Sequence, residues 1–182
     1  VDAVMSRERS TFLPQAADVR VTMEDARVRQ PRWQRSYIAP SVNVGDQADV
    51  YALQVLSEIL GGGSTSHLYQ ALVVNQAVAS SAGTFYSEDA VSYGRFFLSV
   101  SPNPGVSIDT VEAALEAGLE KFLADGVSDE DVARAIRRLE AQFVYAKDSP
   151  TNAARAVGAL LAVGLTLDDI ESWPDRMAEV TA

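Results

Sequence analysis

The stretch Tyr93–Ser101, with the sequence YGRFFLSVS, decides the fold class. Its second half alternates between two rows of side chains, Phe96, Leu98 and Val100 in one row and Phe97, Ser99 and Ser101 in the other. This period of two is typical of a β-strand with one buried face. A second extended stretch, Val78–Ser87, precedes it with only Glu88–Ser92 between them, which predicts an antiparallel hairpin. We interpret the hairpin's four aromatic residues as sheet core: Phe85, Tyr86, Phe96 and Phe97.

Two more extended stretches and two helices are predicted upstream of the hairpin. Val19–Met23 and Arg32–Ile38 both alternate apolar and polar residues, which favours strands. A helix is expected over Asp46–Leu60, because its apolar residues recur at three- and four-residue spacing. Gly61–Gly63 ends that helix, and a second helix is expected over His67–Asn75.

After Gly105 the apolar period changes to 3.6 residues, the period of an α-helix. Helices are expected around the apolar stripes of Ile108–Phe122 and Val132–Phe143, then over Ser149–Gly164, followed by a short element that starts at Thr166. Strands and helices do not alternate regularly along the chain. The order therefore predicts an α+β fold, with an antiparallel sheet that carries helices on one face.

We divide the chain into an N-terminal segment, residues 1–18, and one domain, residues 19–182. The first part has no hydrophobic period and is interpreted as a linker or an incoming segment. Thr181 is suited to cap another helix, so we expect the domain to be truncated at its C-terminal end.

The 182 residues include no cysteine and a single histidine, His67. The absence of cysteine excludes thiol catalysis, thiolate zinc sites and iron–sulfur clusters. Zinc hydrolases combine two or three imidazoles with carboxylates, so one histidine cannot build such a site alone. We therefore expect no catalytic metal within these residues.

The net charge of −10 at pH 7 argues against nucleic-acid binding, because phosphate contacts need a surplus of lysine and arginine. The sequence contains no run of 18 apolar residues and no signal-peptide pattern. We expect no membrane span and identify no targeting address.

The segment Gly61–Ser66, GGGSTS, is the most unusual local feature. It lacks the lysine of a phosphate loop, the last glycine of a dinucleotide fingerprint and the Gly-x-Ser-x-Gly of a nucleophile elbow. It is either a flexible connection between helices or a loop that approaches a ligand or peptide backbone. His67 lies close to Ser64 and Ser66 in the sequence, which suggests a catalytic serine–histidine pair. A surface or capping histidine is the simpler interpretation. The acids Asp129–Asp131 are interpreted as favourable charges at a helix N-terminus rather than a metal site.

Several short stretches carry a resemblance through their order and spacing, although none is decisive alone. They are Pro31-Arg32-Trp33, Tyr37–Ser41, Tyr51-Ala52-Leu53, Ile59–Gly63, Ser64–Tyr69 and Asp148-Ser149. Together they resemble the C-terminal domain of the insulinase-like (M16) zinc peptidases, a family that includes pitrilysin and the mitochondrial processing peptidase. The resemblance runs from about Val19 to Ala182 and implies the LuxS/MPP-like metallohydrolase fold.

The family's domains close around an unfolded peptide, and the first domain holds zinc through His-x-x-Glu-His and a distant glutamate. This chain lacks that motif, so the resemblance implies the half without the metal, with zinc bound in a preceding N-terminal half. In the family this half often supplies an arginine and a tyrosine that hold the substrate. By an ungapped count those positions fall on Val73 and Ser80, and Ser66-His67-Leu68 stands where Ser-Arg-Leu is common.

The resemblance thus implies a non-catalytic C-terminal domain of a zinc-dependent metalloendopeptidase, which forms a wall of the peptide-binding chamber and a partner interface. The substrate-groove candidates are Gly61, Gly62, Gly63, Ser64, His67, Val73 and Ser80. Because the arginine–tyrosine pair is missing, we expect a second M16-type chain that supplies it, or a homodimer. The chain alone is expected to lack peptidase activity.

Two other interpretations stay open. The absence of arginine and tyrosine at Val73 and Ser80 also fits a catalytically inactive M16-like structural or assembly subunit. A small-ligand-binding domain that uses Gly61–Gly63 is the third. The sequence does not assign a compartment, and bacterial periplasm and cytoplasm both remain open.

Overall fold

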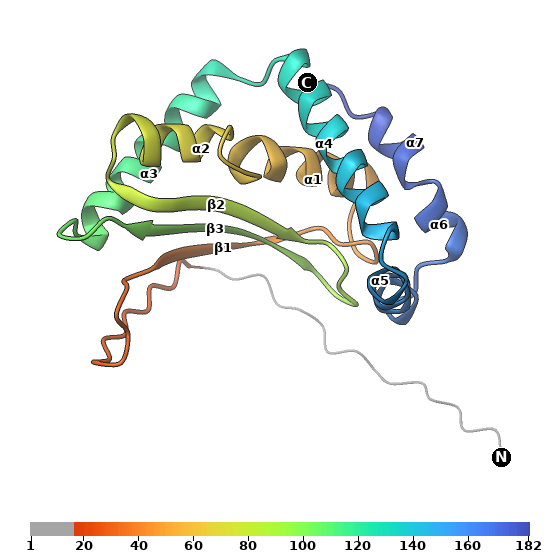
Figure 1. The fold of residues 1–182 in the computed structure, drawn as a ribbon, viewed down its shortest axis with the longest axis horizontal. Helices are drawn as coiled ribbons and strands as arrows, with labels where there is room; N and C mark the ends of the chain where they lie inside the picture. The colour runs from red at the N-terminus through yellow and green to blue at the C-terminus, as the bar shows by residue number, and fades with distance from the viewer. Residues whose placement is uncertain (1–16) are drawn as a thin grey trace.

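The computed structural model describes residues 17–182 and shows a layer of helices on one side of a small sheet (Figure 1). The predicted linker at residues 1–18 falls almost entirely outside the described part. The strands are β1 (Trp33–Ala39), β2 (Ala79–Ser87) and β3 (Gly94–Pro102). The helices are α1 (Gln47–Gly61), α2 (His67–Tyr69) with a π-helical continuation (Gln70–Asn75), α3 (Ile108–Asp125), α4 (Asp129–Lys147), α5 (Pro150–Ala162), α6 (Leu167–Glu171) and α7 (Trp173–Ala178).

The sheet is antiparallel, with the strand order β1-β3-β2, so the strand that decided the fold class lies at its centre. Phe96 of β3 pairs with Tyr37 of β1 and with Tyr86 of β2. The helices pack on one face of this sheet, as expected, and the opposite face carries no helix (Figure 1). Among residues 17–182, no helix is both long enough and apolar enough to cross a membrane.

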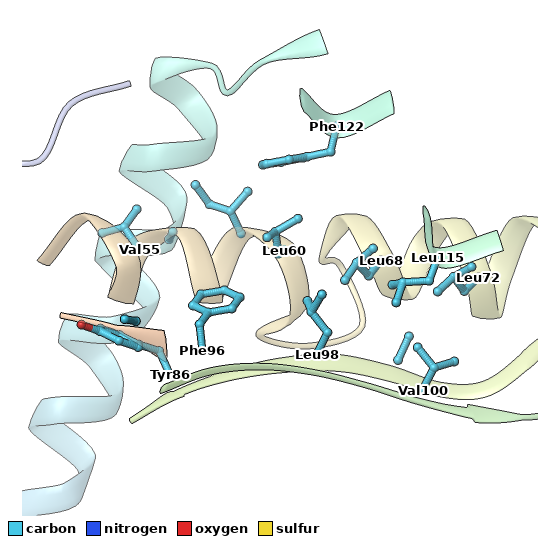
Figure 2. Close-up of a cluster of buried hydrophobic side chains, with 14 of the residues drawn as sticks. Val55, Leu60, Leu68, Leu72, Tyr86, Phe96, Leu98, Val100, Leu115 and Phe122 are labelled. Carbon is cyan, nitrogen blue, oxygen red and sulfur yellow. The ribbon is translucent and has the colours of Figure 1, made fainter. Parts of the chain in front are cut away.

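The core fills the space between the sheet and the helices (Figure 2). Phe96, Leu98 and Val100 are buried, which confirms the inward row of β3. They meet Leu72 and Leu115 from the helical layer, both fully buried. The alternation in β3 therefore selects which face of the sheet receives the helices.

Polar side chains fix the starts of most helices. Asp46, Ser107, Ser128 and Ser149 each accept a hydrogen bond from a backbone N–H in the first turn of α1, α3, α4 and α5. Thr166 begins α6 with a complete capping box. Such caps satisfy N–H groups that have no partner inside the helix, so they set where each helix begins.

The expected strand Val19–Met23 does not form. Its backbone is irregular, and Val19, Val21 and Met23 are 71%, 83% and 82% exposed. A strand needs a neighbouring strand for its backbone groups and a surface that buries its apolar row. Within residues 17–182 this segment finds neither, so the local alternation is not enough to make it a strand.

The prediction that all four hairpin aromatics lie in the core is also wrong. Tyr86 and Phe96 are buried on the helical side, but Phe85 is 63% exposed. Phe85 pairs with Phe97 across the strands, and both rings point to the face without helices. The alternation of side chains along a strand explains this. Because Tyr86 and Phe96 point toward the helices, their chain neighbours Phe85 and Phe97 must point to the opposite face.

We predict that Leu72→Ala lowers the free energy of unfolding by about 2–5 kcal/mol, because it removes a fully buried side chain that the core cannot refill. Leu123→Ala, the matched control on α3, removes a side chain that is 77% exposed and should change it by less than about 0.5 kcal/mol. Urea unfolding followed by circular dichroism measures both. Equal losses from the two variants would contradict the described packing.

Candidate functional site

The segment Gly61–Ser66, which we call the glycine segment, begins where the end of α1 touches the backbone of β2. A Cβ atom on Gly61 would lie 2.1 Å from the backbone nitrogen of Thr84, and one on Gly83 would lie 3.2 Å from the carbonyl oxygen of Gly61. The Thr84 hydroxyl donates a hydrogen bond to the carbonyl oxygen of Ser57, one turn earlier in α1 (2.6 Å). Gly61 is therefore required by direct contact between a helix and a strand.

The next two glycines face the ends of flexible side chains. A Cβ on Gly62 would lie 2.2 Å from the Glu58 carboxylate, and one on Gly63 would lie 2.6 Å from Nη2 of Arg138. Gly63 also adopts a φ of +155°, which residues with a side chain rarely adopt. Gly61 and Gly63 thus have backbone reasons to be glycine, whereas Gly62 faces only a side chain that can shift. This close packing differs from the flexible helix connection that the sequence allowed, and it requires no ligand.

Arg138 of α4 connects the glycine segment to the helical layer through an ion pair and two hydrogen bonds. Its Nε lies 3.0 Å from Oε1 of Glu58, its Nη2 donates to the carbonyl oxygen of Gly62 (2.9 Å), and its Nη1 donates to Thr65 Oγ1 (3.2 Å). The Glu58 side chain is only 7% exposed. Burial raises the pKa of Glu58, while the charge of Arg138 and a hydrogen bond with Gln142 act in the opposite direction.

The serines and the histidine beside the glycines do not form a catalytic pair. The Ser66 hydroxyl is buried and donates to the carbonyl oxygen of Gly63 (2.6 Å), while Ser64 is exposed and its carbonyl oxygen accepts from Gln70. His67 is exposed at the first residue of α2, with its ring edge-on to Phe122 at 5.0 Å. Both serines and His67 therefore serve the turn between α1 and α2.

The surroundings of His67 do not suit a zinc ion. Asp131 is the acid whose pKa responds to His67, but it is lowered first by a hydrogen bond from Ser128 and also by Arg134. Within residues 17–182, no three histidine, cysteine, aspartate or glutamate side chains gather to hold a metal. A single imidazole next to an arginine-paired carboxylate is not a zinc donor set.

The other two candidate residues lie apart from the glycine segment. Val73 is half-buried in the π-helical segment and packs against the core. Ser80 is exposed at an irregularity of β2, where it donates to the carbonyl oxygen of Ser101 (3.2 Å) and accepts from Gln30 Nε2 (3.1 Å). Ser80 lies four positions before Thr84, the residue that Gly61 contacts, which is a distance of about 13 Å along a strand. The structure therefore gathers Gly61–His67 but places Val73 and Ser80 elsewhere.

A larger feature that the sequence reasoning missed is the sheet surface without helices, which we call the open face. Its outward positions follow from the strand register: Gln34, Ser36 and Ile38 along β1, Arg95, Phe97, Ser99 and Ser101 along β3, and Ser81, Gly83, Phe85 and Ser87 along β2. Arg32, just before β1, joins them through its hydrogen bond to Ser99. A shallow groove of about 470 Å³ runs over its centre. The signal was present in the sequence, because Phe85 and Phe97 fall in the outward row of an otherwise polar set.

Two contacts organise the groove. The rings of Phe85 and Phe97 stack with centroids 6.3 Å apart and form one wall. Arg32 lies across the strands and donates from Nε to Ser99 Oγ (2.8 Å). The small residues Ser81 and Gly83 between these groups leave the groove open. The surface can therefore receive a chain that offers apolar side chains to the rings and oxygen acceptors to the arginine.

Known structures share this fold. The inactive peptidase domain of a "putative zinc protease" from Bordetella parapertussis aligns with a TM-score of 0.72 and 22% identity, over 88% of this chain and 84% of that one. A "putative zinc protease" from Bordetella pertussis gives 0.70 and 23%, over 84% and 81%. A Helicobacter pylori protease gives 0.74 and 20% over 86% of this chain, which spans only 37% of that protease. These likenesses show the fold.

The family is shown by sequence. A family model described as the Peptidase M16 inactive domain matches residues 6–139, so the chain belongs to that family. No curated protein matches the chain. The protein is therefore an inactive M16 peptidase domain, as the resemblance implied, in the α+β fold with a one-sided helical layer.

We predict that Gly61→Ala lowers the free energy of unfolding by about 2 kcal/mol or more, because its methyl group meets the backbone of β2, which cannot move aside. Gly158→Ala in α5 is the matched control, since a Cβ there meets nothing within 4 Å. It should raise stability by about 0.5–1 kcal/mol. Thermal unfolding compares the two, and a neutral Gly61→Ala would contradict the contact.

We predict that Arg138→Ala costs about 2 kcal/mol at pH 8, because it leaves the buried Glu58 carboxylate without its cation. Losing that cation raises the folded-state pKa of Glu58 further above its ordinary value of 4.5, so the variant loses stability as the pH rises from 4.5 through the new pKa. Its deficit should therefore be smaller at pH 5 than at pH 8.

Arg134→Ala is the control for this pair, because Arg134 contacts only exposed or partly exposed acids on its own helix, Glu130 and Asp131. It should cost less than about 1 kcal/mol at either pH. Urea unfolding of both variants at pH 5 and pH 8 measures the loss of stability that each substitution causes. An Arg138→Ala deficit that does not depend on pH would show that Glu58 is not the group left unpaired.

Proposed function

We propose that this chain is the non-catalytic C-terminal domain of a zinc-dependent M16 metalloendopeptidase, and that it forms one wall of a peptide-binding chamber. The observation that carries the proposal is the open face, with its groove and its aromatic pair, in a domain whose helices all lie on the other side. Zinc would be held by a preceding half of the parent protein. The chain's own part is to bind and orient peptide.

The edge of the sheet adds a second way to hold an extended peptide. β2 is a terminal strand in the order β1-β3-β2, so within residues 17–182 its outer backbone groups pair with no further strand. An extended chain can add to such an edge through main-chain hydrogen bonds, with little dependence on sequence. None of the candidate residues Gly61–Gly63, Ser64, His67, Val73 and Ser80 lines the groove of the open face, and a contact between them and substrate stays a prediction.

A partner is part of the proposal. Val73 packs an apolar side chain into the core and Ser80 presents a hydroxyl, so neither offers the guanidinium or phenol that holds substrate opposite a zinc ion. We therefore propose a second M16-type chain that brings the arginine and tyrosine, or a homodimer. A catalytically inactive assembly subunit is the alternative, and the same two residues favour it.

The test is to co-express this chain with the N-terminal half of its parent and with a candidate second M16-type chain. The proposal predicts bound zinc in the assembled complex, cleavage of unfolded peptides, and loss of cleavage when this domain is omitted. Zinc binding without cleavage by any combination would favour the assembly subunit. Cleavage by the N-terminal half alone would contradict a role for this domain.

A further inference from the structure

The open face carries a charge pattern opposite to that of the whole protein. The chain has a net charge of −10, yet none of the twelve outward positions of the open face is aspartate or glutamate, and two of them, Arg32 and Arg95, are arginine. Within the described residues, neither arginine forms an ion pair with a carboxylate, although Arg20, Arg35 and Arg138 do. The face therefore keeps two positive charges available to a ligand.

The nearest acids at the Arg95 end belong to the turn between β2 and β3. Arg95 lies opposite Ser87 in the register, and Ser87 Oγ donates to Asp89 at 3.4 Å. Glu88 beside it is half-buried, and burial raises its pKa to about 7. Arg32 lines the groove and Arg95 lies beyond it on β3, and none of the residues that line the groove is aspartate or glutamate.

The arginines flank the aromatic pair at regular spacing. Along β3, Arg95 is two residues to one side of Phe97, and Ser99, which Arg32 contacts, is two residues to the other side. Two residues of an extended strand span about 6.6 Å. A second extended chain that follows β3 presents its same-side residues at the same interval, so its side chains can match this row of cation, ring and cation.

From this we propose that the open face selects extended peptide segments in which acidic residues lie two positions before and two positions after an apolar residue. The carboxylates would pair with Arg32 and Arg95, and the apolar side chain would pack on Phe85 and Phe97. This specificity rests on the proposed function and names its substrate class. Because the protein as a whole is negative, an acidic chain is attracted only where positive charge is local, and the two arginines supply such charge on the open face.

The experiment uses three fluorescent peptides of equal length, with the cores Glu-x-Phe-x-Glu, Ala-x-Phe-x-Ala and Lys-x-Phe-x-Lys, titrated with the chain in an anisotropy assay. The acidic peptide should bind about tenfold more tightly than the basic one, and this preference should shrink as salt is raised. The double variant R32Q/R95Q should weaken the acidic peptide about fivefold and change the neutral one by less than about twofold.

Two control variants separate charge from packing. Arg137 is an exposed arginine on α4, so R137Q should leave all three affinities within about twofold. Phe85→Ala should weaken the acidic and neutral peptides equally, since both use the rings. An effect of R137Q as large as that of R32Q/R95Q would overturn the proposal, because it would show attraction by general charge.

The outcomes distinguish this inference from the function on which it rests. If acidic and neutral peptides bind equally and F85A weakens both, the domain binds peptide but the acidic preference is refuted. If none of the three peptides binds, the peptide-binding wall itself is refuted. If instead the chain forms a dimer that F85A dissociates, a second copy occupies the open face and the proposal falls.

Discussion

The backbones of α1 and β2 meet at Gly61, closer than any side chain permits. A methyl group there would lie 2.1 Å from the backbone nitrogen of Thr84, and the Thr84 hydroxyl binds α1 one turn earlier. This contact seats the end of α1 directly on the strand. Arg138 of α4 then holds the following turn through Glu58 and the carbonyl oxygen of Gly62. The position of the helical layer on the sheet therefore depends on a few atoms at the end of α1.

Because the helices are fixed on one side, the other side of the sheet is left uncovered. On β3 the inward row is apolar and buried, while the outward row has one ring, Phe97, among polar residues. Such a row has little to gain from a covering helix, since burying polar groups without hydrogen-bond partners costs free energy. The rings of Phe85 and Phe97 are the exception, and they form the apolar surface that the proposed peptide would cover.

The sequence was most informative where local signals and long-range packing agree. The alternation in β3 located the hairpin and the buried face, and the change of apolar period after Gly105 located the helices that follow. It misled at Val19–Met23, where alternation exists without a neighbouring strand. The role of Gly61 could not be predicted from the sequence, because the atom that requires glycine there belongs to the backbone of Thr84, 23 positions further along the chain. For the candidate site, the sequence alone indicated the family and contained no zinc-binding motif. Recognising the open face also requires the register of three strands, which only the structure gives.

The central claim is that the open face, rather than the helical layer, meets the peptide. The most direct measurement places a photo-reactive benzoylphenylalanine at Phe85 of the full-length parent protein, with the same group at Leu123 on α3 as the control. After illumination with a defined unfolded peptide, we expect a cross-link to the peptide from position 85 and none from position 123. Cross-links from position 123, with none from position 85, would contradict it.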